Sequence, residues 1–320
     1  MNPPLTAAAC ASPAPGQQTS PERHAVPDLA DAQAYAAWRE RKLAGRARSA
    51  AELQVDIGDP RALTPDERQA LLQRCARWNM AIYRCRDAVA DKPAVLALAR
   101  QLGLRRLDGN WLADDDGLSS IAVRDGEPRG EYIPYTTRPI KWHTDGYYHP
   151  DGRRIHGMLL HCVRAAAAGG VNALLDHELA YIALRDASPR WLGALMASDA
   201  MTIPARTDEG GVARAAQAGP VFSIGAGGAL HMRYTARTRS IVWKDDAATR
   251  EAVAFLERFL ADNPFTLRLR LEPGMGLVAN NVLHDRSGFA DDPAAPRLLW
   301  RARYLDRVDA PAPEAAWRSG

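Results

Sequence analysis

Residues 141–150 read KWHTDGYYHP, and this stretch carries the strongest signal in the chain. His143 and Asp145 lie two residues apart. On a strand, residues two apart point to the same face and lie about 7 Å apart along the chain. An imidazole and a carboxylate can then approach one metal ion from one edge of a sheet.

A third metal ligand has to come from elsewhere in the chain, and His284 in NNVLHDRSGF (280–289) is the candidate. It follows an apolar run, at the start of a polar loop. Two histidines and one carboxylate on one face of an iron leave three coordination positions open, as in non-haem ferrous oxygenases. His-x-Asp alone also fits a structural role, and His149 is near enough in sequence to compete as a ligand.

Thirteen residues after His284, the segment RLLWRARY (297–304) places several arginines on one face of an expected strand. One interpretation is a solvated edge strand with a basic outer face. The other is an inward guanidinium that grips a carboxylate with two hydrogen bonds. 2-Oxoglutarate carries such a carboxylate at the end distant from its keto acid.

The rest of the chain divides into a helical first third and a strand-rich remainder. Helices are expected over about 30–48, from Thr64 onward, from about Lys92 to Gly103, and over about 246–262. Short apolar runs between turn residues predict strands near 119–124, 140–145, 155–163, 171–176, 221–224, 229–234, 265–271, 276–281 and 297–305. Many short strands of this kind favour a barrel or jelly roll.

Composition narrows the functional classes. The 320 residues are 47% hydrophobic and 25% charged, and 41 basic against 38 acidic residues leave a net charge of +3. This balance predicts no strong attraction to nucleic acid or to a membrane surface. The four cysteines form no Cys-x-x-Cys pair, and no secretion signal or long apolar segment is visible, so we expect a cytoplasmic enzyme with small-molecule partners. Self-association into a homo-oligomer stays open.

Four segments together resemble the taurine dioxygenase/TfdA family of Fe(II)- and 2-oxoglutarate-dependent oxygenases, over about residues 130–305. They are WHTDGYY, LLHCVRAAAAGGVNALLD, LEPGMGLVANNVLHDRSGF and RLLWRARY. The second is most similar to gamma-butyrobetaine hydroxylase-like members. The resemblance implies a mainly β fold with flanking helices, namely a double-stranded β-helix (a jelly roll, clavaminate synthase-like).

The same resemblance gives the expected domain organisation. A disordered tail covers residues 1–28, and a helical region over 29–110 packs on the core. The double-stranded β-helix oxygenase domain covers 111–310, and a short tail covers 311–320.

The family pattern implies a role for each matching residue. His143, Asp145 and His284 correspond to the iron ligands, and Arg297 to the residue that binds the distal carboxylate of 2-oxoglutarate. Asn172 stands where many members carry a threonine or serine that assists the cosubstrate, and its amide can still donate a hydrogen bond.

Two further positions follow from the same pattern. Arg301 matches a second, substrate-facing arginine, and no catalytic residue is expected beyond the metal ligands. Asn280-Asn281 replaces the family's aspartate–asparagine pair, so either the acidic support of His284 is missing or another partner orients it.

The substrate is less well defined, and the resemblance implies oxidation of a small organic molecule, most simply by hydroxylation. Aromatic rings near the metal segment fit either a cage for a quaternary ammonium group or ordinary core and lid packing. They are Tyr132, Tyr135, Trp142, Tyr147 and Tyr148. Arg301 indicates an anionic group instead, and a zwitterion would satisfy both.

Polar candidates for the pocket rim come from the segment RYTARTR. They are Tyr234, Arg237 and Arg239, which fit a basic loop equally well.

Two rival functions differ in what they require. A metal-binding β-barrel that acts as a hydrolase or isomerase without 2-oxoglutarate needs no buried Arg297. A non-catalytic binding module tolerates the loss of a metal ligand.

Overall fold

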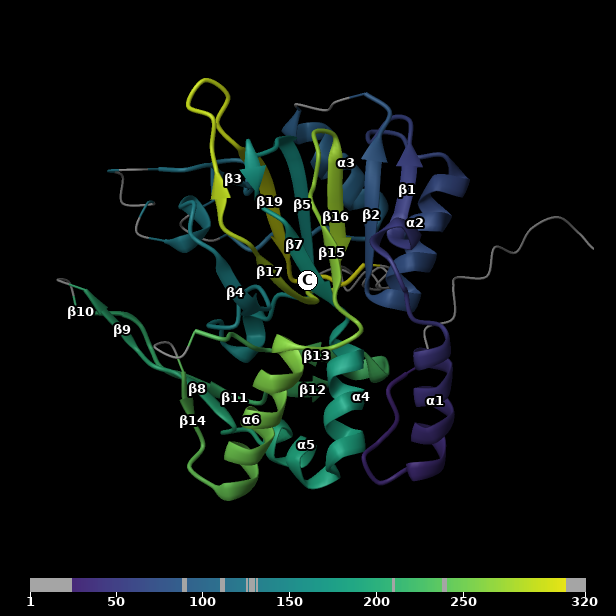
Figure 1. The fold of residues 1–320 in the computed structure, drawn as a ribbon, viewed down its shortest axis with the longest axis vertical. Helices are drawn as coiled ribbons and strands as arrows, with labels where there is room; N and C mark the ends of the chain where they lie inside the picture. Colours follow the sequence, from purple (N-terminus) through teal and green to yellow (C-terminus); the bar gives the residue numbers. More distant parts are fainter. Residues whose placement is uncertain are drawn as a thin grey trace, which may run out of the picture.

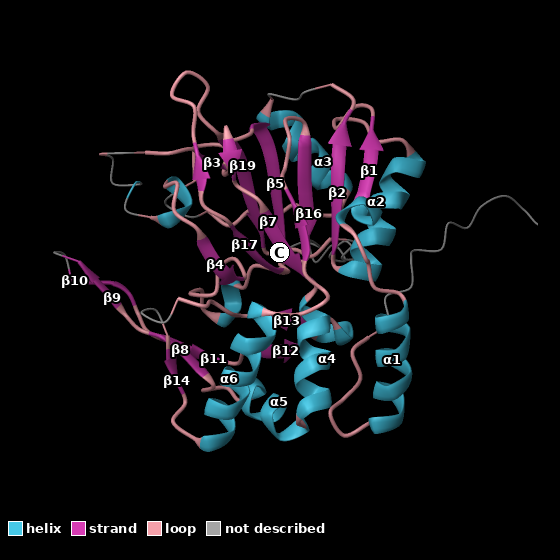
Figure 2. Ribbon diagram, in the orientation of Figure 1, coloured by secondary structure: helices cyan, strands magenta, loops and turns pink. Residues whose placement is uncertain are grey.

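Two β-sheets packed face to face form the centre of the molecule (Figures 1 and 2). The computed structural model describes residues 25–87, 91–109, 113–124, 126, 130, 132–208, 211–237 and 241–308. The tails were expected at 1–28 and 311–320, and of these, residues 1–24 and 311–320 lie outside the described residues. Residues 25–28 belong to the fold, because Val26 is buried and its N–H donates to the carbonyl of Gly228.

The larger sheet has six strands in the order β1-β2-β16-β5-β19-β3. β1 and β2 are parallel, and the other neighbours are antiparallel. The strand bounds are β1 (Gln54–Ile57), β2 (Met80–Cys85), β16 (Met275–Ala279), β5 (Gly157–Arg164), β19 (Leu298–Tyr304) and β3 (Ser119–Ile121). β19 is an inner strand, flanked by β5 and β3, so the arginine-rich segment is not a solvated edge.

The smaller sheet has four antiparallel strands in the order β15-β7-β17-β4. These are β15 (Leu267–Leu269), β7 (Asn172–Leu175), β17 (Leu283–Arg286) and β4 (Ile140–His143). Apolar side chains from both sheets form one core, in which Leu160, Leu277 and Leu299 of the larger sheet meet Leu174 and Leu267 of the smaller. Two facing antiparallel sheets are the arrangement of a jelly roll.

Two helices cover the outer face of the larger sheet, α2 (Pro65–Trp78) and α3 (Lys92–Gln101). α2 begins as predicted, because Thr64 accepts from the backbone of Glu67 and Glu67 accepts from that of Thr64. Trp300 and Tyr304 of β19 lie in this outer core. The alternate residues Arg301 and Arg303 therefore face inward, toward the smaller sheet.

A second body of helices and short strands packs below the sheets in Figure 1. Its helices are α1 (Ala32–Ala44), α4 (His177–Ala187), α5 (Pro189–Met196) and α6 (Ala247–Ala261). Its strands are β8 (Met201–Ile203), β11 (Gln217–Gly219), β14 (Val242–Trp243), β12 (Phe222–Ile224) and β13 (Leu230–Met232). The hairpin of β9 (Arg206–Asp208) and β10 (Gly211–Arg214) projects from this body, at the left of Figure 1.

The remaining elements are short. β6 (Ala168–Gly169) pairs with β18 (Phe289–Ala290). Single 3-10 turns are η1 (Ala50–Leu53), η3 (Ile133–Tyr135), η4 (Asp151–Arg153) and η5 (Ala226–Gly228).

Among the described residues, the sequence patterns located four helices and nine strands but missed two helices and ten strands, including β1, β2 and β17. His284, which we expected at the start of a polar loop, lies within strand β17. α4 is buried around most of its circumference, and even its charged residues Glu178 and Arg185 are buried, so its polar positions do not mark a solvent-facing side. α5 is only eight residues long and follows α4 after a single residue, Ser188, which caps it. The predicted helices at 30–48, 64 onward, 92–103 and 246–262 are confirmed as α1, α2, α3 and α6.

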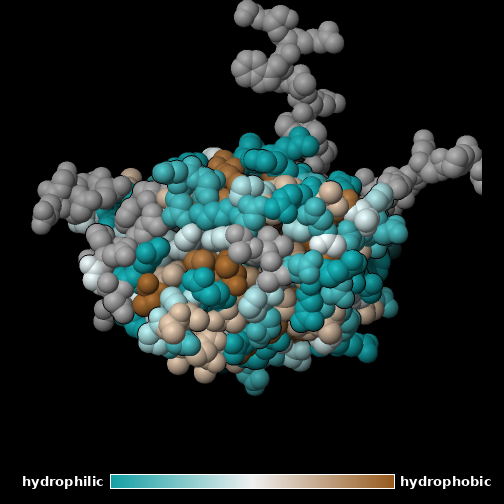
Figure 3. Space-filling view, turned by 90° about the horizontal axis from the view of Figure 1, so that it is seen from above, coloured by the Kyte–Doolittle hydropathy of each residue, from teal (hydrophilic) through white to brown (hydrophobic). Residues whose placement is uncertain are grey.

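Within the described part of the chain, no helix combines the length and the apolar character needed to cross a bilayer. Seen from above, the surface is largely hydrophilic, and hydrophobic residues form small separate patches (Figure 3). This surface agrees with the nearly even charge balance of the sequence.

Candidate active site

The two histidines of the predicted metal site come from neighbouring strands of the smaller sheet. β17 and β4 are antiparallel, and His284 is paired directly with His143. Directly paired residues of antiparallel strands carry side chains on the same face, only about 5 Å apart. The sheet register therefore joins residues 143 and 284, and their ring centroids lie 4.1 Å apart.

Asp145 lies just beyond the end of β4, which stops at His143 and not at residue 145 as predicted. Asn281 holds it there, because the N–H of Asp145 donates to Asn281 Oδ1 (2.8 Å) and Asn281 Nδ2 donates to the Asp145 carbonyl (3.0 Å). Gly146 follows with φ +67°, and a Cβ there would lie 2.3 Å from Ile155 Cγ1. Only glycine fits this turn, which directs the Asp145 carboxylate toward the histidines.

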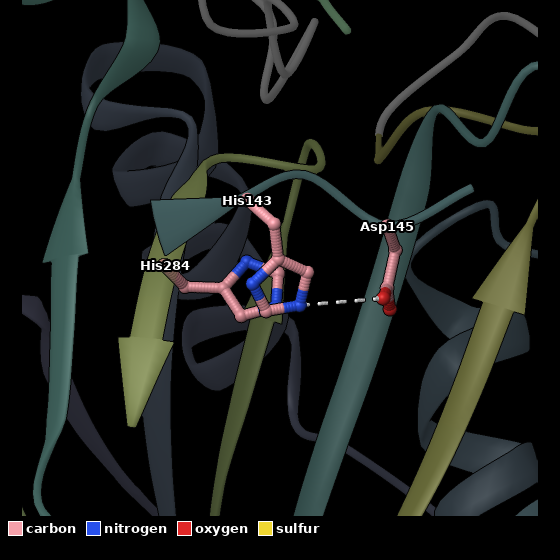
Figure 4. A group of neighbouring side chains, drawn as sticks. All are labelled: His143, Asp145 and His284. Carbon is pink, nitrogen blue, oxygen red and sulfur yellow. Dashed lines mark ion pairs between the residues drawn. The ribbon is translucent and has the colours of Figure 1, made fainter. Parts of the chain in front are cut away.

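The three side chains point toward one another (Figure 4). One ligand atom from each of His143, Asp145 and His284 lies within 4.8 Å of the other two. His143 Nδ1 lies 2.9 Å from the carbonyl oxygen of Lys141, and His284 Nδ1 lies 3.0 Å from that of Val282. Each Nδ1–H therefore donates to backbone, which leaves the Nε2 lone pair of each ring free for a metal.

The protonation states also suit a divalent metal. Burial and the neighbouring His284 lower the pKa of His143 to about 3, so its ring is neutral at pH 7. Burial alone would raise the pKa of Asp145, but the charges of Arg301 and His284 outweigh it and keep the carboxylate ionised. Asp145 Oδ2 is buried without a hydrogen-bond partner. An orphaned carboxylate oxygen beside two imidazoles fits an iron ion.

Arg297 lies immediately before β19 and is only 5% exposed. Its guanidinium carbon stacks 4.9 Å from the centroid of Phe289. Among the described residues, no carboxylate forms an ion pair with this guanidinium. Burial lowers the pKa of Arg297 to about 10, so it is still charged at pH 7. A buried, unpaired guanidinium is costly without an anion, which indicates a binding site for one.

Arg297 lines a small hollow that is partly open to solvent. Asn172, at the start of β7, lines the same hollow, and its Nδ2 is buried without a partner. The other lining residues are Ala165, Ala166, Gly169, Gly170, Arg270, Leu271 and Leu299. Unsatisfied donors from Asn172 and a free guanidinium fit the distal carboxylate of 2-oxoglutarate.

Arg301 and Arg303 face the metal site but are already paired. Arg301 Nη1 lies 3.3 Å from Asp145 Oδ1, so this arginine supports a metal ligand as well as facing the substrate side. Arg303 donates to Tyr148 Oη (2.7 Å) and to Asp108 Oδ2 (2.6 Å).

Asp108 is a buried carboxylate that the sequence motifs did not reveal. Besides Arg303, it accepts from Arg153 Nη2 (2.6 Å) and lies 3.2 Å from His149 Nε2. Burial alone would raise the pKa of Asp108, but these neighbours lower it to about 2. Because His149 is engaged by Asp108, it does not compete as a metal ligand in this arrangement.

The predicted substrate residues take different positions. Tyr147 and Tyr148 are half-buried, with ring centroids 5.3 Å apart, and follow the metal segment directly. Trp142 is half-buried against the helical body, and Tyr135 is fully buried. Tyr234 is only 1% exposed and packs in the same hydrophobic core as Trp142. It therefore does not lie at a pocket rim, as we expected from the sequence.

The basic segment after Tyr234 is described only in part. Arg237 is exposed, two residues beyond Thr235, which bridges to His143. Arg239 lies outside the described residues.

Asn280 and Asn281 turn out to be scaffold residues. Asn280 bonds to Asn79 and to the N–H of Val308, and Asn281 holds the Asp145 backbone. His284 needs no acidic partner, because the carbonyl of Val282 orients its ring.

The comparisons with known proteins agree with this geometry. A family model described as "Taurine catabolism dioxygenase TauD, TfdA family" matches residues 40–303. A uridine-5'-phosphate dioxygenase from Amycolatopsis sp. is 30% identical over 276 residues, covering 80% of this chain and 97% of the relative. A second protein of that name, from Streptomyces sp., is 33% identical over 209 residues. The match covers 62% of this chain and 73% of the relative.

Solved structures support the fold. An asparagine oxygenase in complex with Fe(II), hydroxyasparagine and succinate superposes with a TM-score of 0.52 at 16% identity, covering 83% of this chain and 89% of its own. A putative alpha-ketoglutarate-dependent taurine dioxygenase from Burkholderia xenovorans gives 0.54 at 16% identity, covering 79% and 90%. The expected double-stranded β-helix is thereby confirmed.

The family model matches most of the chain, and one relative is covered over 97% of its length. Together these matches assign the chain to a family. The chain belongs to the TauD/TfdA family and is an Fe(II)- and 2-oxoglutarate-dependent dioxygenase.

Proposed function

We propose that this dioxygenase holds ferrous iron on His143, Asp145 and His284 and anchors 2-oxoglutarate through Arg297 and Asn172. The observation that carries this proposal is the meeting of the three ligand atoms within 4.8 Å, beside a separate hollow that contains a buried, unpaired arginine. A hydrolase, an isomerase or a binding module built on a metal barrel has no need of that arginine.

When bound, iron and 2-oxoglutarate supply with dioxygen an oxidant that removes a hydrogen atom from the substrate, while 2-oxoglutarate leaves as succinate and carbon dioxide. The protein's own residues position and shield this chemistry. The carbonyls of Lys141 and Val282 fix the two imidazoles, and Asn281 fixes the backbone of Asp145. Burial of Asp145 and His284 keeps water from the centre.

We further propose that the primary substrate is a small molecule with a phosphate group, and that uridine-5'-phosphate is the first compound to test. The two relatives above bear that substrate in their names. The charges beside the metal also favour an anion. Three arginines pair with Asp145 and Asp108 on this side, namely Arg153, Arg301 and Arg303, and Asp145 would also share its charge with the iron. A fourth, Arg214, lies over the ring of Tyr148.

The same charges argue against the quaternary ammonium substrate that the aromatic residues suggested. Arg214 and Arg303 already lie 5.5 and 5.9 Å from the centroid of the Tyr148 ring. A cationic ligand would have to displace them or bind beside them. An anionic group, alone or in a zwitterion, meets no such repulsion.

The test is succinate formation from 2-oxoglutarate under air, with and without ferrous iron. Uridine-5'-phosphate should stimulate it strongly, and uridine, which lacks the phosphate, should stimulate it weakly. Equal stimulation by both compounds would contradict a phosphate-bearing substrate. Iron-independent succinate formation would contradict the metal assignment.

The cellular location is likewise a proposal. Cys75, Cys85 and Cys162 are buried free thiols, which suits a reducing cytoplasm. Fractionation of cells that express the chain would test this location.

A further inference from the structure

Arg270 lies in the same hollow as Arg297 and has no role in the proposed function so far. It follows β15 of the smaller sheet, whereas Arg297 precedes β19 of the larger sheet. Cys162 lies on the inner face of β5. Burial raises the pKa of its thiol to about 11, and the charges of both guanidiniums act in the opposite direction. Two arginines from opposite sheets therefore border one small space.

The hydrogen bonds of Arg270 leave part of its guanidinium free. One terminal nitrogen donates to the carbonyl of Ala166. Its Nε is buried and makes no hydrogen bond, although Glu272 Oε1 lies 3.3 Å away. The Glu272 side chain is 49% exposed, and a pair this open to solvent is held weakly.

The surroundings of the hollow carry an excess of positive charge. Arg286 and Arg297 both stack on Phe289, at 4.7 and 4.9 Å from its centroid. Burial, together with the charge of Arg297, lowers the pKa of Arg286 to about 9. Among the described residues, no carboxylate lines the hollow itself, although Glu272 pairs weakly with Arg270 and the charge of Asp291 acts on Arg297.

A carboxylate has two oxygens with about four acceptor positions. A two-pronged contact with Arg297 uses two of them, and the orphaned donors of Asn172 and Arg270 match the other two. Gly169 and Gly170 line the same point of the hollow. The donors that border the hollow therefore suit one carboxylate.

We propose that Arg270 is a second guanidinium contact for the distal carboxylate of 2-oxoglutarate and a determinant of the preference for a dicarboxylic cosubstrate. This inference rests on the proposed function, because it uses the same hollow. It assigns a recognition role to a residue that lies outside the iron-ligand and Arg297 motifs.

The test is the dissociation constant for 2-oxoglutarate, measured anaerobically on the iron-loaded protein from the absorption band that forms when the keto acid binds. A hydrogen bond to a charged group contributes about 1.5 kcal/mol or more, so Arg270→Met should raise this constant about tenfold. Arg268→Met is the matched control, because Arg268 is exposed on the same strand. It should stay within about twofold of wild type.

A second ligand separates recognition from a structural effect. 2-Oxobutyrate has the keto acid but no distal carboxylate, so Arg270→Met should change its dissociation constant little. An equal loss of affinity for both ligands would overturn the inference. If the methionine variant does not fold by circular dichroism, Arg270→Gln, which keeps a donor for the Ala166 carbonyl, replaces it with the same expected results.

The Arg297→Met variant shows which proposal has failed. If it loses affinity while Arg270→Met binds as wild type, Arg270 is only a packing residue and the proposed function stands. If Arg297→Met also binds 2-oxoglutarate as wild type, the hollow is not the cosubstrate site and the proposed function fails there too.

Discussion

The two ends of β19 carry the same residue type on the same face but in different electrostatic surroundings. Arg297, at the beginning, is buried beside Phe289 without a described carboxylate partner. Arg301 and Arg303, further along, lie against Asp145 and Asp108. An unpaired buried arginine is available to a ligand, whereas a paired one first positions its partner. Sequence spacing cannot make this distinction, because it depends on residues far away in the chain.

The largest effect is expected from losing the proposed metal, which the residues at both ends of β19 adjoin. His284→Ala should abolish iron-dependent succinate formation, because one of three ligands is lost. The protein should remain folded, because water can fill the space that the His284 ring leaves at the metal site. Iron stoichiometry and circular dichroism test this together. A full equivalent of iron in the variant would show that the ligand set is wrong.

Arg297→Ala tests the unpaired end of the strand. It should raise the dissociation constant of 2-oxoglutarate about ten- to hundredfold, because a charged hydrogen bond contributes about 1.5–3 kcal/mol. Iron binding should be unchanged. Anaerobic titration measures both. An unchanged affinity for 2-oxoglutarate would show that Arg297, like Arg301, does not bind the cosubstrate.

Arg301→Ala tests the paired end. It should leave 2-oxoglutarate affinity within about threefold, because its backbone position lies roughly 13 Å from that of Arg297. Binding of the primary substrate, and its coupling to 2-oxoglutarate consumption, should weaken. The ratio of product to succinate measures that coupling. A tenfold loss of cosubstrate affinity here would reverse the roles of the two arginines.

Asp108→Asn tests whether pairing positions Arg303. The change leaves Arg303 buried beside a neutral amide, which we expect to lower the free energy of unfolding by about 3 kcal/mol. The Michaelis constant for the substrate should rise, while 2-oxoglutarate affinity stays unchanged. Denaturant unfolding and steady-state kinetics measure these effects. Asp116→Asn, at a more exposed carboxylate paired with Lys92, is the control and should change neither.

The smallest effect concerns buried histidines. Burial lowers the pKa of His156 as it lowers that of Arg297, but His156 is then uncharged at pH 7, whereas Arg297 keeps its charge. His156 and His231 lie 5.1 Å apart by ring centroids, and burial lowers the pKa of His156 to about 4. Burial and the charge of His156 also lower the pKa of His231. Nearby Arg307 and Arg154 add to the effect at both rings.

These histidines predict a loss of stability in acid. Their folded-state pKa values lie below the unfolded value of about 6.5, so the unfolded chain binds more protons as the pH falls. Stability is then present above about pH 6.5 and decreases as the pH falls toward 4. The Tm should fall by several degrees between pH 7 and pH 5, and His156→Gln should reduce that slope. An identical slope in the variant would assign the pH dependence to other groups.

The proposed metal and cosubstrate residues were accessible to sequence analysis because each belongs to an ordered motif. His143, Asp145, His284 and Arg297 were predicted together, and the structure brings the first three to one point. The direct pairing of His143 with His284 was not predictable, since strand register depends on the whole sheet.

Arg270 and Asp108 were missed for identifiable physical reasons. Alternation along residues 265–271 assigns Arg268 and Arg270 to the same outer face, but β15 ends at Leu269. Beyond the strand the alternation no longer applies, and Arg270 lines the hollow. Asp108 lies in a loop without a motif, and its partners come from residues more than 40 positions away.

The most direct test of the account is a crystal structure of the protein grown anaerobically with ferrous iron and 2-oxoglutarate. We predict one iron bound by His143, Asp145 and His284, with the distal carboxylate of 2-oxoglutarate against the Arg297 guanidinium. Iron at another position, or a distal carboxylate held by Arg301 in place of Arg297, would contradict it.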